Sequence, residues 1–185
     1  ITRQLALVAG TVYLEDRPMR EMPYKDVSQK MAVVLTERLR TELMTCEDVV
    51  ATGRYPYTGY FGILSGEDYE AVREAMELVH ITDIKDCDFT KISDGQRQRV
   101  MLARAICQKP EIIILDEPTS YLDVKYKLEF LSVLQELRNK KKLTVIMSLH
   151  ELELAEKVSD YILCVGGKYI DRFGVPEEIF TQGYI

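Results

Sequence analysis

Short apolar runs, separated by turn-forming or polar stretches, form the pattern along this chain. Thr11–Leu14 and Met31–Leu35 contain several β-branched residues, which predicts two short buried strands. Between them, Glu15–Pro18 has residues typical of a turn. Further along, Ile112–Leu115 is an uninterrupted apolar run, typical of a strand covered on both faces, and Thr144–Ser148 predicts another buried strand.

Helical periodicity fills the intervals between these runs. A loop rich in Gly, Pro and Tyr spans Gly53–Gly66, and a helix is predicted after it and another after Gly95. The apolar positions of the first helix are Val72, Ala75, Met76 and Val79. A third amphipathic helix is marked by Leu128, Leu131, Leu134 and Leu137. Strands that alternate with helices predict an α/β fold with a mainly parallel sheet.

The last part of the chain repeats the alternation on a smaller scale. Glu151–Val158 predicts a helix. Tyr161–Val165 and Lys168–Ile170 flank a pair of glycines, which predicts a β-hairpin. Pro176 suits the first position of a closing helix, because the N–H that proline lacks has no partner there.

Composition narrows the class of protein. A chain of 185 residues is long enough for one domain with a sizeable core, and its net charge of -6 argues against nucleic-acid binding. No apolar run approaches the ~20 residues of a membrane-spanning helix, and the first residues lack a signal-peptide pattern. The cysteines lack metal-site spacing and are expected to be reduced core thiols of a cytosolic protein. They are Cys46, Cys87, Cys107 and Cys164.

Two carboxylates, Asp116 and Glu117, follow directly after the run Ile112–Leu115. Open α/β folds bind ligands at the carboxyl edge of a parallel sheet. The first carboxylate suits a Mg²⁺ ion that keeps several waters, and the second suits orienting a water that attacks a phosphate. A strand end capped by surface acids is the alternative interpretation.

Three polar segments accompany this pair. Ser93–Arg99 leads into a predicted helix, where Ser and Gly offer a hydroxyl and backbone N–H groups to an anion. Ser120–Asp123 follows the acidic pair within one short loop. His150 directly follows the segment Thr144–Leu149. It is either a structural histidine or a side chain at the same sheet edge.

The order and spacing of these segments resemble an ABC ATPase. Ser93–Gln96 resembles the signature motif, with Ile92 in place of the usual leucine and Asp94 in place of the first glycine. The acidic pair resembles the Walker B aspartate followed by the catalytic glutamate. Ser120–Asp123 resembles the D-loop, and His150 resembles the switch histidine.

The resemblance implies a head-to-tail dimer of ATPase subunits that encloses two Mg-ATP molecules. It makes Glu117 and His150 catalytic residues and Asp116 a ligand of Mg²⁺. The signature and D-loop of one subunit contact the ATP of the other through Ser93, Gly95, Gln96 and Asp123. The cofactors implied are ATP and Mg²⁺, and no nucleic acid is implied.

A second metal ligand is less well defined by the resemblance. Where most family members have a Mg²⁺-contacting glutamine, this chain has Thr36, followed by Glu37. Either side-chain oxygen suits the metal. Alternatively, Thr36–Arg40 is only a loop that transmits changes to the transporter.

The glycine-rich phosphate loop of the family is not found in the sequence. The family places it upstream of Thr11–Leu14, and only nine residues precede Gly10. We expect residues to be missing before Ile1 and before Gly10, through disorder or truncation. The competing interpretation is a short protein that cannot hold nucleotide by itself.

Two segments resemble importers of iron-siderophores, haem and cobalamin. They are Val50–Gly59, with its Gly-Arg-Tyr-Pro sequence, and Val33–Arg38. The resemblance implies a peripheral subunit on the cytoplasmic face of the membrane, bound to permease subunits and supplied by an extracytoplasmic substrate-binding protein. Tyr55, Tyr57 and Tyr60 either dock on the permease or pack the small subdomain.

The implied fold is an α/β, P-loop NTPase-like ABC ATPase domain with a helical subdomain inserted into a mainly parallel sheet core. The expected division is a partial ATPase core over residues 1–40, a helical subdomain over 41–90, and the signature helix with the remaining core over 91–185. The expected function is the ATPase subunit of an iron-chelate importer. The alternatives are a non-catalytic fragment that acts only in dimerisation, and a soluble ABC protein that acts on ribosomes or DNA.

Overall fold

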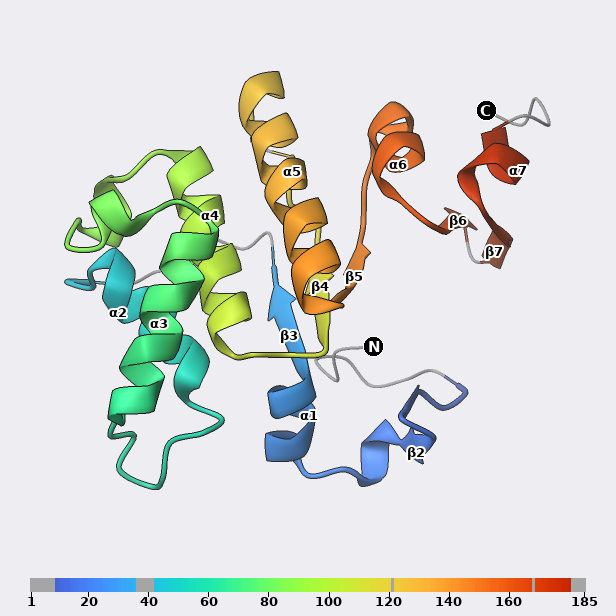
Figure 1. The fold of residues 1–185 in the computed structure, drawn as a ribbon. Coiled ribbons are helices and arrows are strands. Elements are labelled where there is room, and N and C mark those ends of the chain that lie inside the picture. The colour runs from blue at the N-terminus through green and yellow to red at the C-terminus, as the bar shows by residue number, and fades with distance from the viewer. Residues whose placement is uncertain (1–8, 36–41, 121, 168, 181–185) are drawn as a thin grey trace. The chain divides into compact units, whose positions relative to one another are not determined.

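The computed structural model describes residues 9–35, 42–120, 122–167 and 169–180. The chain forms two compact units, residues 1–147 and 148–185, and each is described by itself. Within the described residues, the first unit has a three-stranded sheet, a group of helices and an N-terminal hairpin (Figure 1). In its described residues the second unit has a two-stranded hairpin and two helices.

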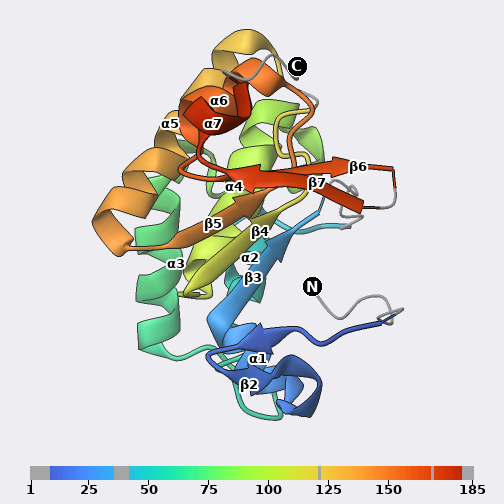
Figure 2. The same ribbon diagram turned by 90° about the vertical axis from the view of Figure 1, so that its right-hand side faces the viewer.

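The sheet of the first unit is parallel. Its strands are β3 (Met31–Val34), β4 (Ile112–Leu115) and β5 (Thr144–Met147). β4 is the central strand, and Ile112 pairs with Met31 on one side and with Thr144 on the other. Figure 2 shows the three strands side by side. The predicted α/β fold with a parallel sheet is therefore confirmed.

Burial of the strands follows their place in the sheet. On β4, Ile113 and Leu115 are buried, and Ile114 packs against a cluster on the other face, so this strand is covered on both faces as predicted. The expectation that the third strand is buried is wrong. None of the β5 residues is buried, and Ile146 is 43% exposed, because β5 lies at an edge of the described sheet.

Helices occupy the segments between the strands. They are α1 (Tyr24–Lys30), α2 (Cys46–Ala51), α3 (Gly66–Leu78), α4 (Asp94–Cys107) and α5 (Val124–Lys141). Short 3-10 helices are η1 (Met19–Glu21), η2 (Thr52–Arg54), η3 (Thr82–Ile84) and η4 (Phe89–Lys91). α2 and α3 pack against α4, which also contacts β3 (Figure 1). The predicted helices are confirmed, whereas the boundaries at 40/41 and 90/91 stay predictions.

The starts of α2, α3 and α4 share one hydrogen-bond pattern. At each start a Ser or Thr side chain accepts from the backbone N–H three residues later, and the side chain at that later position accepts from the cap N–H. The pairs are Thr45 with Asp48, Ser65 with Asp68, and Ser93 with Gln96. The local sequence therefore determines where these helices begin.

The predicted apolar face of α5 is partly wrong. Leu131, Leu134 and Leu137 are buried, but Leu128 is 54% exposed, and Phe130 is buried in addition. Successive steps of three residues each turn the helix by about 300°, so four such positions spread over about half of its circumference. One end of the series therefore falls outside the packed face.

The N-terminal hairpin pairs β1 (Tyr13–Leu14) with β2 (Arg17–Pro18). Glu15 and Asp16 form its two-residue turn with positive φ angles of 50° and 61°, as the right-handed twist of such hairpins favours. The strand expected over Thr11–Leu14 is thus shorter, and Tyr13 is 62% exposed whereas Leu14 is buried. Alternate side chains of a strand point to opposite faces, which accounts for the difference.

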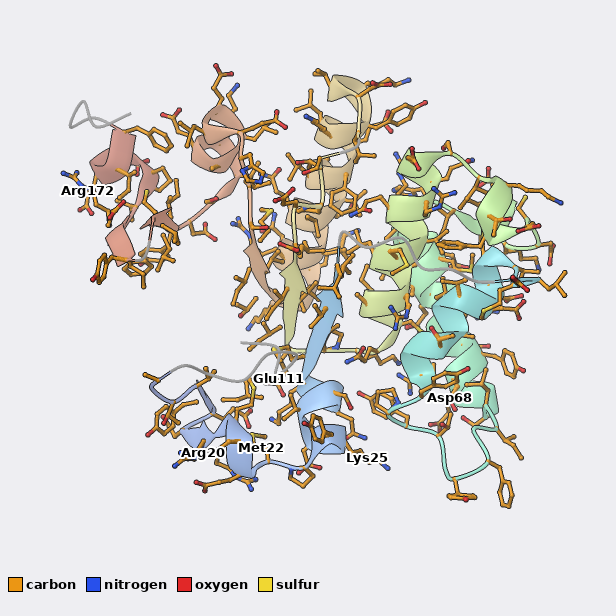
Figure 3. The ribbon with its side chains drawn as sticks, turned by 180° about the vertical axis from the view of Figure 1, so that it is seen from behind. Arg20, Met22, Lys25, Asp68, Glu111 and Arg172 are labelled. Carbon is orange, nitrogen blue, oxygen red and sulfur yellow. The ribbon has the colours of Figure 1, made fainter. Side chains whose placement is uncertain are left out.

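A methionine-rich cluster joins this hairpin to the sheet. Its buried members are Leu14, Met19, Met22, Val27 and Met31, and Ile112 and Ile114 pack against it. At its edge Lys30 Nζ lies 2.5 Å from Glu15 Oε2 and 3.2 Å from Glu111 Oε1. Glu111 lies just before β4, and Met22 lies in the N-terminal segment (Figure 3).

The second unit contains α6 (Leu152–Val158), β6 (Ile162–Gly166), β7 (Tyr169–Gly174) and α7 (Pro176–Phe180). β6 and β7 pair antiparallel, with Ile162 opposite Gly174, and Gly167 in the turn has a φ of 57°. The predicted hairpin and the helix beginning at Pro176 are confirmed.

The cysteines only partly match the expectation of core thiols. All four are free, and Cys46 and Cys107 are buried, but Cys87 is exposed and Cys164 is half-buried. Burial raises the pKa of the Cys46 thiol to about 11 and that of Cys107 to about 12, so both are poor nucleophiles. Among the described helices none is long and apolar enough to cross a membrane.

Candidate functional site

The acidic pair lies at the carboxyl end of the central strand. Leu115 ends β4, and the backbone N–H of the next residue, Asp116, donates to Val34 O at 2.9 Å. This bond extends the parallel pairing by one residue and fixes Asp116 beside the end of β3. Asp116 is exposed and Glu117 is half-buried, so both carboxylates are near solvent.

Glu117 has an unusual backbone. Its φ is 43°, in the left-handed region that a residue with a side chain adopts at a cost of roughly 1–2 kcal/mol. The turn that follows supports it: Ser120 N donates to Glu117 O at 3.2 Å, and Ser120 Oγ donates to Glu117 Oε2 at 3.0 Å. A strained residue with a positioned carboxylate at a strand end is typical of functional sites.

The start of α4 carries the second group of predicted site residues. Ser93 caps the helix: its Oγ accepts from Gln96 N at 3.2 Å, and Ser93 N donates to Gln96 Oε1 at 3.0 Å. The Gly95 N–H lies in the first turn, where N–H groups have no acceptor inside the helix. The helix dipole adds positive potential there, so this end of α4 suits an anion.

Asp94 introduces a negative charge at this helix start. Arg97 balances it, because Arg97 Nη1 lies 2.6 Å from Asp94 Oδ1. Arg97 Nη2 also donates to Ile92 O at 3.4 Å, which ties the helix start to the residue before the cap. The departure from glycine at position 94 is therefore accompanied by a compensating ion pair.

The first turns of α4 face the first turns of α5. A Cβ on Gly95 would lie 3.5 Å from the ring of Tyr126, and Arg99 forms an ion pair with Glu129. A cavity of about 320 Å³ lies there, lined by residues of both helices and of the segment around η3. Tyr126, Arg99 and Glu129 were not predicted, because this contact joins residues about 30 positions apart and leaves no local pattern.

Asp123 occupies the N-cap of α5 and is exposed. Aspartate is a preferred cap residue, yet its side chain makes no capping hydrogen bond here. This places an acidic side chain, not used by its own helix, directly after the loop that carries Ser120.

The remaining predicted residues lie in the second unit or outside the described residues. His150 lies in the second unit, three residues after the end of β5, and is exposed. Thr36 and the alternative Glu37 lie outside the described residues, as does Tyr121 of the loop before Asp123.

A family model described as ABC transporter matches residues 1–120 of this chain. This chain belongs to the ABC transporter family. It is 40% identical over 173 residues to an uncharacterized ABC transporter ATP-binding protein of Methanocaldococcus jannaschii, and the match covers 94% of this chain and 60% of that protein. It is 34% identical over 182 residues to a petrobactin import ATP-binding protein of Bacillus anthracis, covering 98% and 67%.

A solved structure agrees with this assignment. It is described as an inward-facing conformation of an ABC transporter, and it matches with a TM-score of 0.78 and 28% identity over 82% of this chain and 61% of that chain. The predicted ABC ATPase fold is confirmed. The chain spans 60% and 67% of the lengths of the two curated relatives.

The donor chemistry of this ABC family chain fits Mg²⁺ at the end of β4. Mg²⁺ is usually held by one or two carboxylates together with waters and phosphate oxygens, and Asp116 supplies such a carboxylate. In the part of the chain that the structure describes, no group of three or more His, Cys, Asp or Glu is arranged to hold a metal. A carboxylate at a strand end matches an ion that completes its coordination with waters and phosphate oxygens.

Arg54 of the Gly-Arg-Tyr-Pro segment and Tyr57 just after it pack against the helices, whereas Tyr60 further along is exposed. Tyr57 Oη donates to Gln108 O at 2.8 Å, so this tyrosine packs the helices. Arg54 Nε lies 2.7 Å from Asp68 Oδ1, and both side chains are only 8% exposed. Tyr60, in contrast, is 98% exposed.

The buried Arg54–Asp68 pair is expected to make stability depend on pH. Hydrogen bonds from Ser65 and the Arg54 guanidinium lower the pKa of Asp68 from 3.8 to about 2 despite its burial. Its contribution is complete above pH ~4 and is lost as the pH falls toward ~2. Asp68→Asn leaves Arg54 without its counter-charge and is expected to lower the free energy of unfolding at pH 7 by about 3–5 kcal/mol.

Urea unfolding at pH 7 and pH 3 tests this expectation, and the gap between wild type and Asp68→Asn should narrow at pH 3. Asp48→Asn is the matched control, since Asp48 has the same capping role in α2 without a buried arginine as its partner among the described residues. A constant gap at both pH values, or an equal loss from Asp48→Asn, would contradict the role of the pair.

Proposed function

We propose that this chain is part of the ATP-binding and ATP-hydrolysing subunit of an ABC importer that drives uptake of an iron chelate. An iron-siderophore complex is the first candidate, with haem or cobalamin next. The observation that carries the proposal is Glu117, whose carboxylate is held by Ser120 at the end of the central strand, beside Asp116. The petrobactin import relative supports the choice of cargo.

In this proposal ATP and Mg²⁺ are the cofactors, and Asp116 and Thr36 hold the ion. When bound, Mg²⁺ neutralises phosphate charge during hydrolysis. Glu117 orients and polarises the attacking water, and His150 is the second catalytic residue. Phosphoryl transfer depends on positioning and charge neutralisation, and these side chains suit those tasks.

The start of α4 acts on the nucleotide of a second copy of the subunit. The Gly95 N–H and the Ser93 hydroxyl donate to its phosphates, helped by the dipole of α4. For this, the Ser93 hydroxyl turns away from Gln96 Oε1, to which it now donates at 3.0 Å. Asp123, whose side chain does not cap its own helix, is available to the same interface.

The dimer lies on the cytoplasmic face of the membrane, bound to permease subunits, and a substrate-binding protein outside supplies the cargo. The permease contact is the loop of Tyr60, Phe61 and Ile63, which are 98%, 84% and 77% exposed. The rings of Tyr60 and Phe61 pack edge to face at 5.6 Å. Large apolar side chains gathered on one exposed loop are typical of contact with another protein.

Gly95→Ala in the full-length protein is expected to weaken ATP-dependent dimerisation by at least about tenfold, a loss of ~1.4 kcal/mol, because a methyl group would keep the phosphate from the N–H. The melting temperature should stay unchanged, since the added Cβ would make an ordinary 3.5 Å contact with Tyr126. Sedimentation with and without ATP and thermal unfolding measure the two effects.

Gly66→Ala is the matched control, because Gly66 also lies in the first turn of a helix and a Cβ added there would meet no atom within 4 Å. Equal dimerisation of the two variants would refute the role of Gly95. A wild-type protein that does not dimerise with ATP would refute the proposed mechanism.

Two alternative functions can each be distinguished from the proposed one by a simple observation. A non-catalytic fragment acting only in dimerisation is contradicted by ATP hydrolysis of the full-length protein. A soluble ABC protein acting on ribosomes or DNA is contradicted by copurification with a membrane permease.

A further inference from the structure

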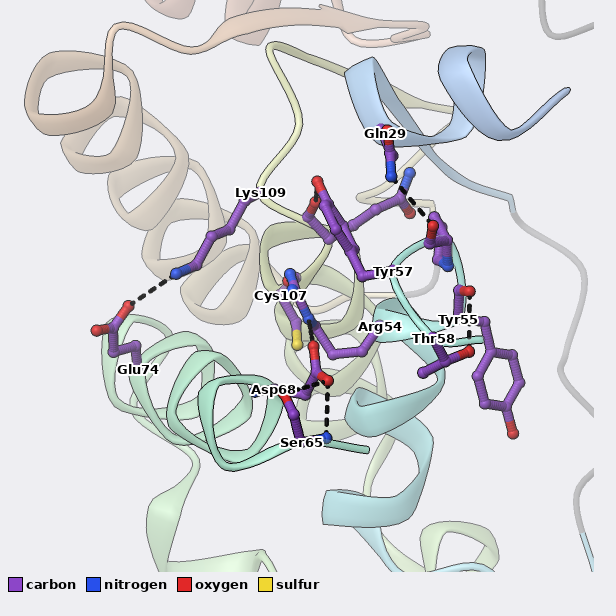
Figure 4. A network of polar contacts seen from close by, with 12 residues as sticks. Gln29, Arg54, Tyr55, Tyr57, Thr58, Ser65, Asp68, Glu74, Cys107 and Lys109 are labelled. Atoms are coloured by element: carbon purple, nitrogen blue, oxygen red, sulfur yellow. Dashed lines mark hydrogen bonds and ion pairs between the residues drawn. The ribbon is translucent and has the colours of Figure 1, made fainter. Parts of the chain in front are cut away.

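Six residues, Thr52–Tyr57, wrap around the C-terminal end of α4, and we call them the clasp (Figure 4). Arg104 Nε donates to Thr52 Oγ1 at 2.9 Å, and Gly53 packs so closely that a Cβ would lie 2.2 Å from Arg104 O. The clasp thus holds the last turns of α4 through both side chains and backbone.

Arg54 and Tyr57 bind the carbonyl groups at this helix end. Arg54 Nη1 donates to Cys107 O at 2.9 Å, and Tyr57 Oη donates to Gln108 O at 2.8 Å. The last carbonyls of a helix lack partners within it, and a cation there is favoured by the helix dipole. The Arg54 guanidinium also lies 3.9 Å from the centre of the Tyr57 ring, so the two contacts support each other.

The clasp is connected to the sheet as well. Gln108 Nε2 donates to Met31 O at 2.9 Å, at the first residue of β3, and Gln29 Nε2 donates to Pro56 O at 3.1 Å. Asp68 of α3 completes the connection through Arg54. The clasp therefore links α3, α4 and the start of β3 at one point.

The two ends of α4 have different neighbours. The clasp holds the end at Cys107, and the other end carries Ser93 and Gly95. The exposed loop of Tyr60, Phe61 and Ile63 follows directly after the clasp in the chain. α4 has 14 residues and is about 20 Å long, so a displacement of its clasped end moves its start as well.

We propose that Arg54 and Tyr57 are positioning residues that transmit a displacement of the exposed loop to the start of α4. This inference rests on the proposed function, because contact with the permease is what displaces the loop. The clasp makes the loop and α4 move together, so that docking sets the position of Ser93 and Gly95. Without the clasp the loop still binds the permease, but the start of α4 no longer responds.

Tyr57→Phe tests the proposal in the full-length protein with its permease. It removes one hydroxyl and keeps the ring beneath Arg54. Basal kcat and KM for ATP are expected to stay within about twofold, while stimulation by the permease falls about fivefold, the effect of losing one typical hydrogen bond. Tyr55→Phe is the matched control, because Tyr55 is 61% exposed and lies in the same turn.

Arg54→Lys provides a second variant, since a single ammonium reaches either Asp68 or Cys107 O but does not reproduce both bonds. It should show the same selective loss of stimulation. Full stimulation of Tyr57→Phe and Arg54→Lys, or an equal fall of basal and stimulated rates, would overturn the clasp proposal alone. A wild-type protein that its permease does not stimulate would instead overturn the proposed function.

Discussion

ATP hydrolysis by the full-length protein is expected to fall about 10²–10⁴-fold when Glu117 is replaced by Gln, the usual range for loss of a positioned acid–base group. The amide is neutral and does not polarise the attacking water as the carboxylate does. Folding should be unaffected, because a Gln oxygen still accepts the Ser120 hydroxyl that bonds Glu117 Oε2 at 3.0 Å. ATP-dependent dimerisation should persist.

Phosphate release and sedimentation in ATP measure the two parts of this prediction. Glu67→Gln serves as the control, since Glu67 is an exposed carboxylate in the first turn of α3. Hydrolysis at the wild-type rate in Glu117→Gln would remove Glu117 from the mechanism. A loss of both hydrolysis and thermal stability would assign it a structural role.

Gly53→Ala is expected to lower the free energy of unfolding by about 1–3 kcal/mol, as overpacking of a close contact does. Its Cβ would lie 2.2 Å from Arg104 O and 3.4 Å from the Cys107 Cβ. The nearest obstacle is a backbone carbonyl of α4, which has no rotamer by which to move aside. The clash between the added Cβ and this carbonyl can therefore be relieved only if η2 and α4 move apart.

Urea unfolding at neutral pH measures this loss. Gly59→Ala is the matched control, because a Cβ added at Gly59 would meet no atom within 4 Å. If the two variants unfold at the same urea concentration, the close contact between η2 and α4 does not contribute to stability as inferred.

Structural features that depend on residues close together in the chain are predicted well from the sequence. The Ile112–Leu115 run forms the central strand, so Asp116 and Glu117 necessarily follow at its carboxyl end. The expected helix after Ser93 is α4, which begins at Asp94. Likewise, the closing helix expected at Pro176 is α7.

Features that depend on distant partners were missed or misjudged. The apolar content of β5 suggested a buried strand, but burial depends on what covers it, and Ile146 is 43% exposed. The sequence is compatible with Tyr57 either docking on the permease or packing the subdomain, and its hydrogen bond to Gln108 O, 51 positions away, shows that it packs. The exposure of Tyr60 and Phe61 is likewise set by the fold around them.

Interactions among residues close in the chain account for the order of strands and helices, which can therefore be predicted from the sequence together with the residues of the candidate site. Long-range packing, in contrast, brings Tyr126 to Gly95 and lets Arg54 join Asp68 to the end of α4. It also set Glu117 in its left-handed conformation. These arrangements follow from how the elements pack, and packing joins residues whose spacing in the sequence carries no periodic signal.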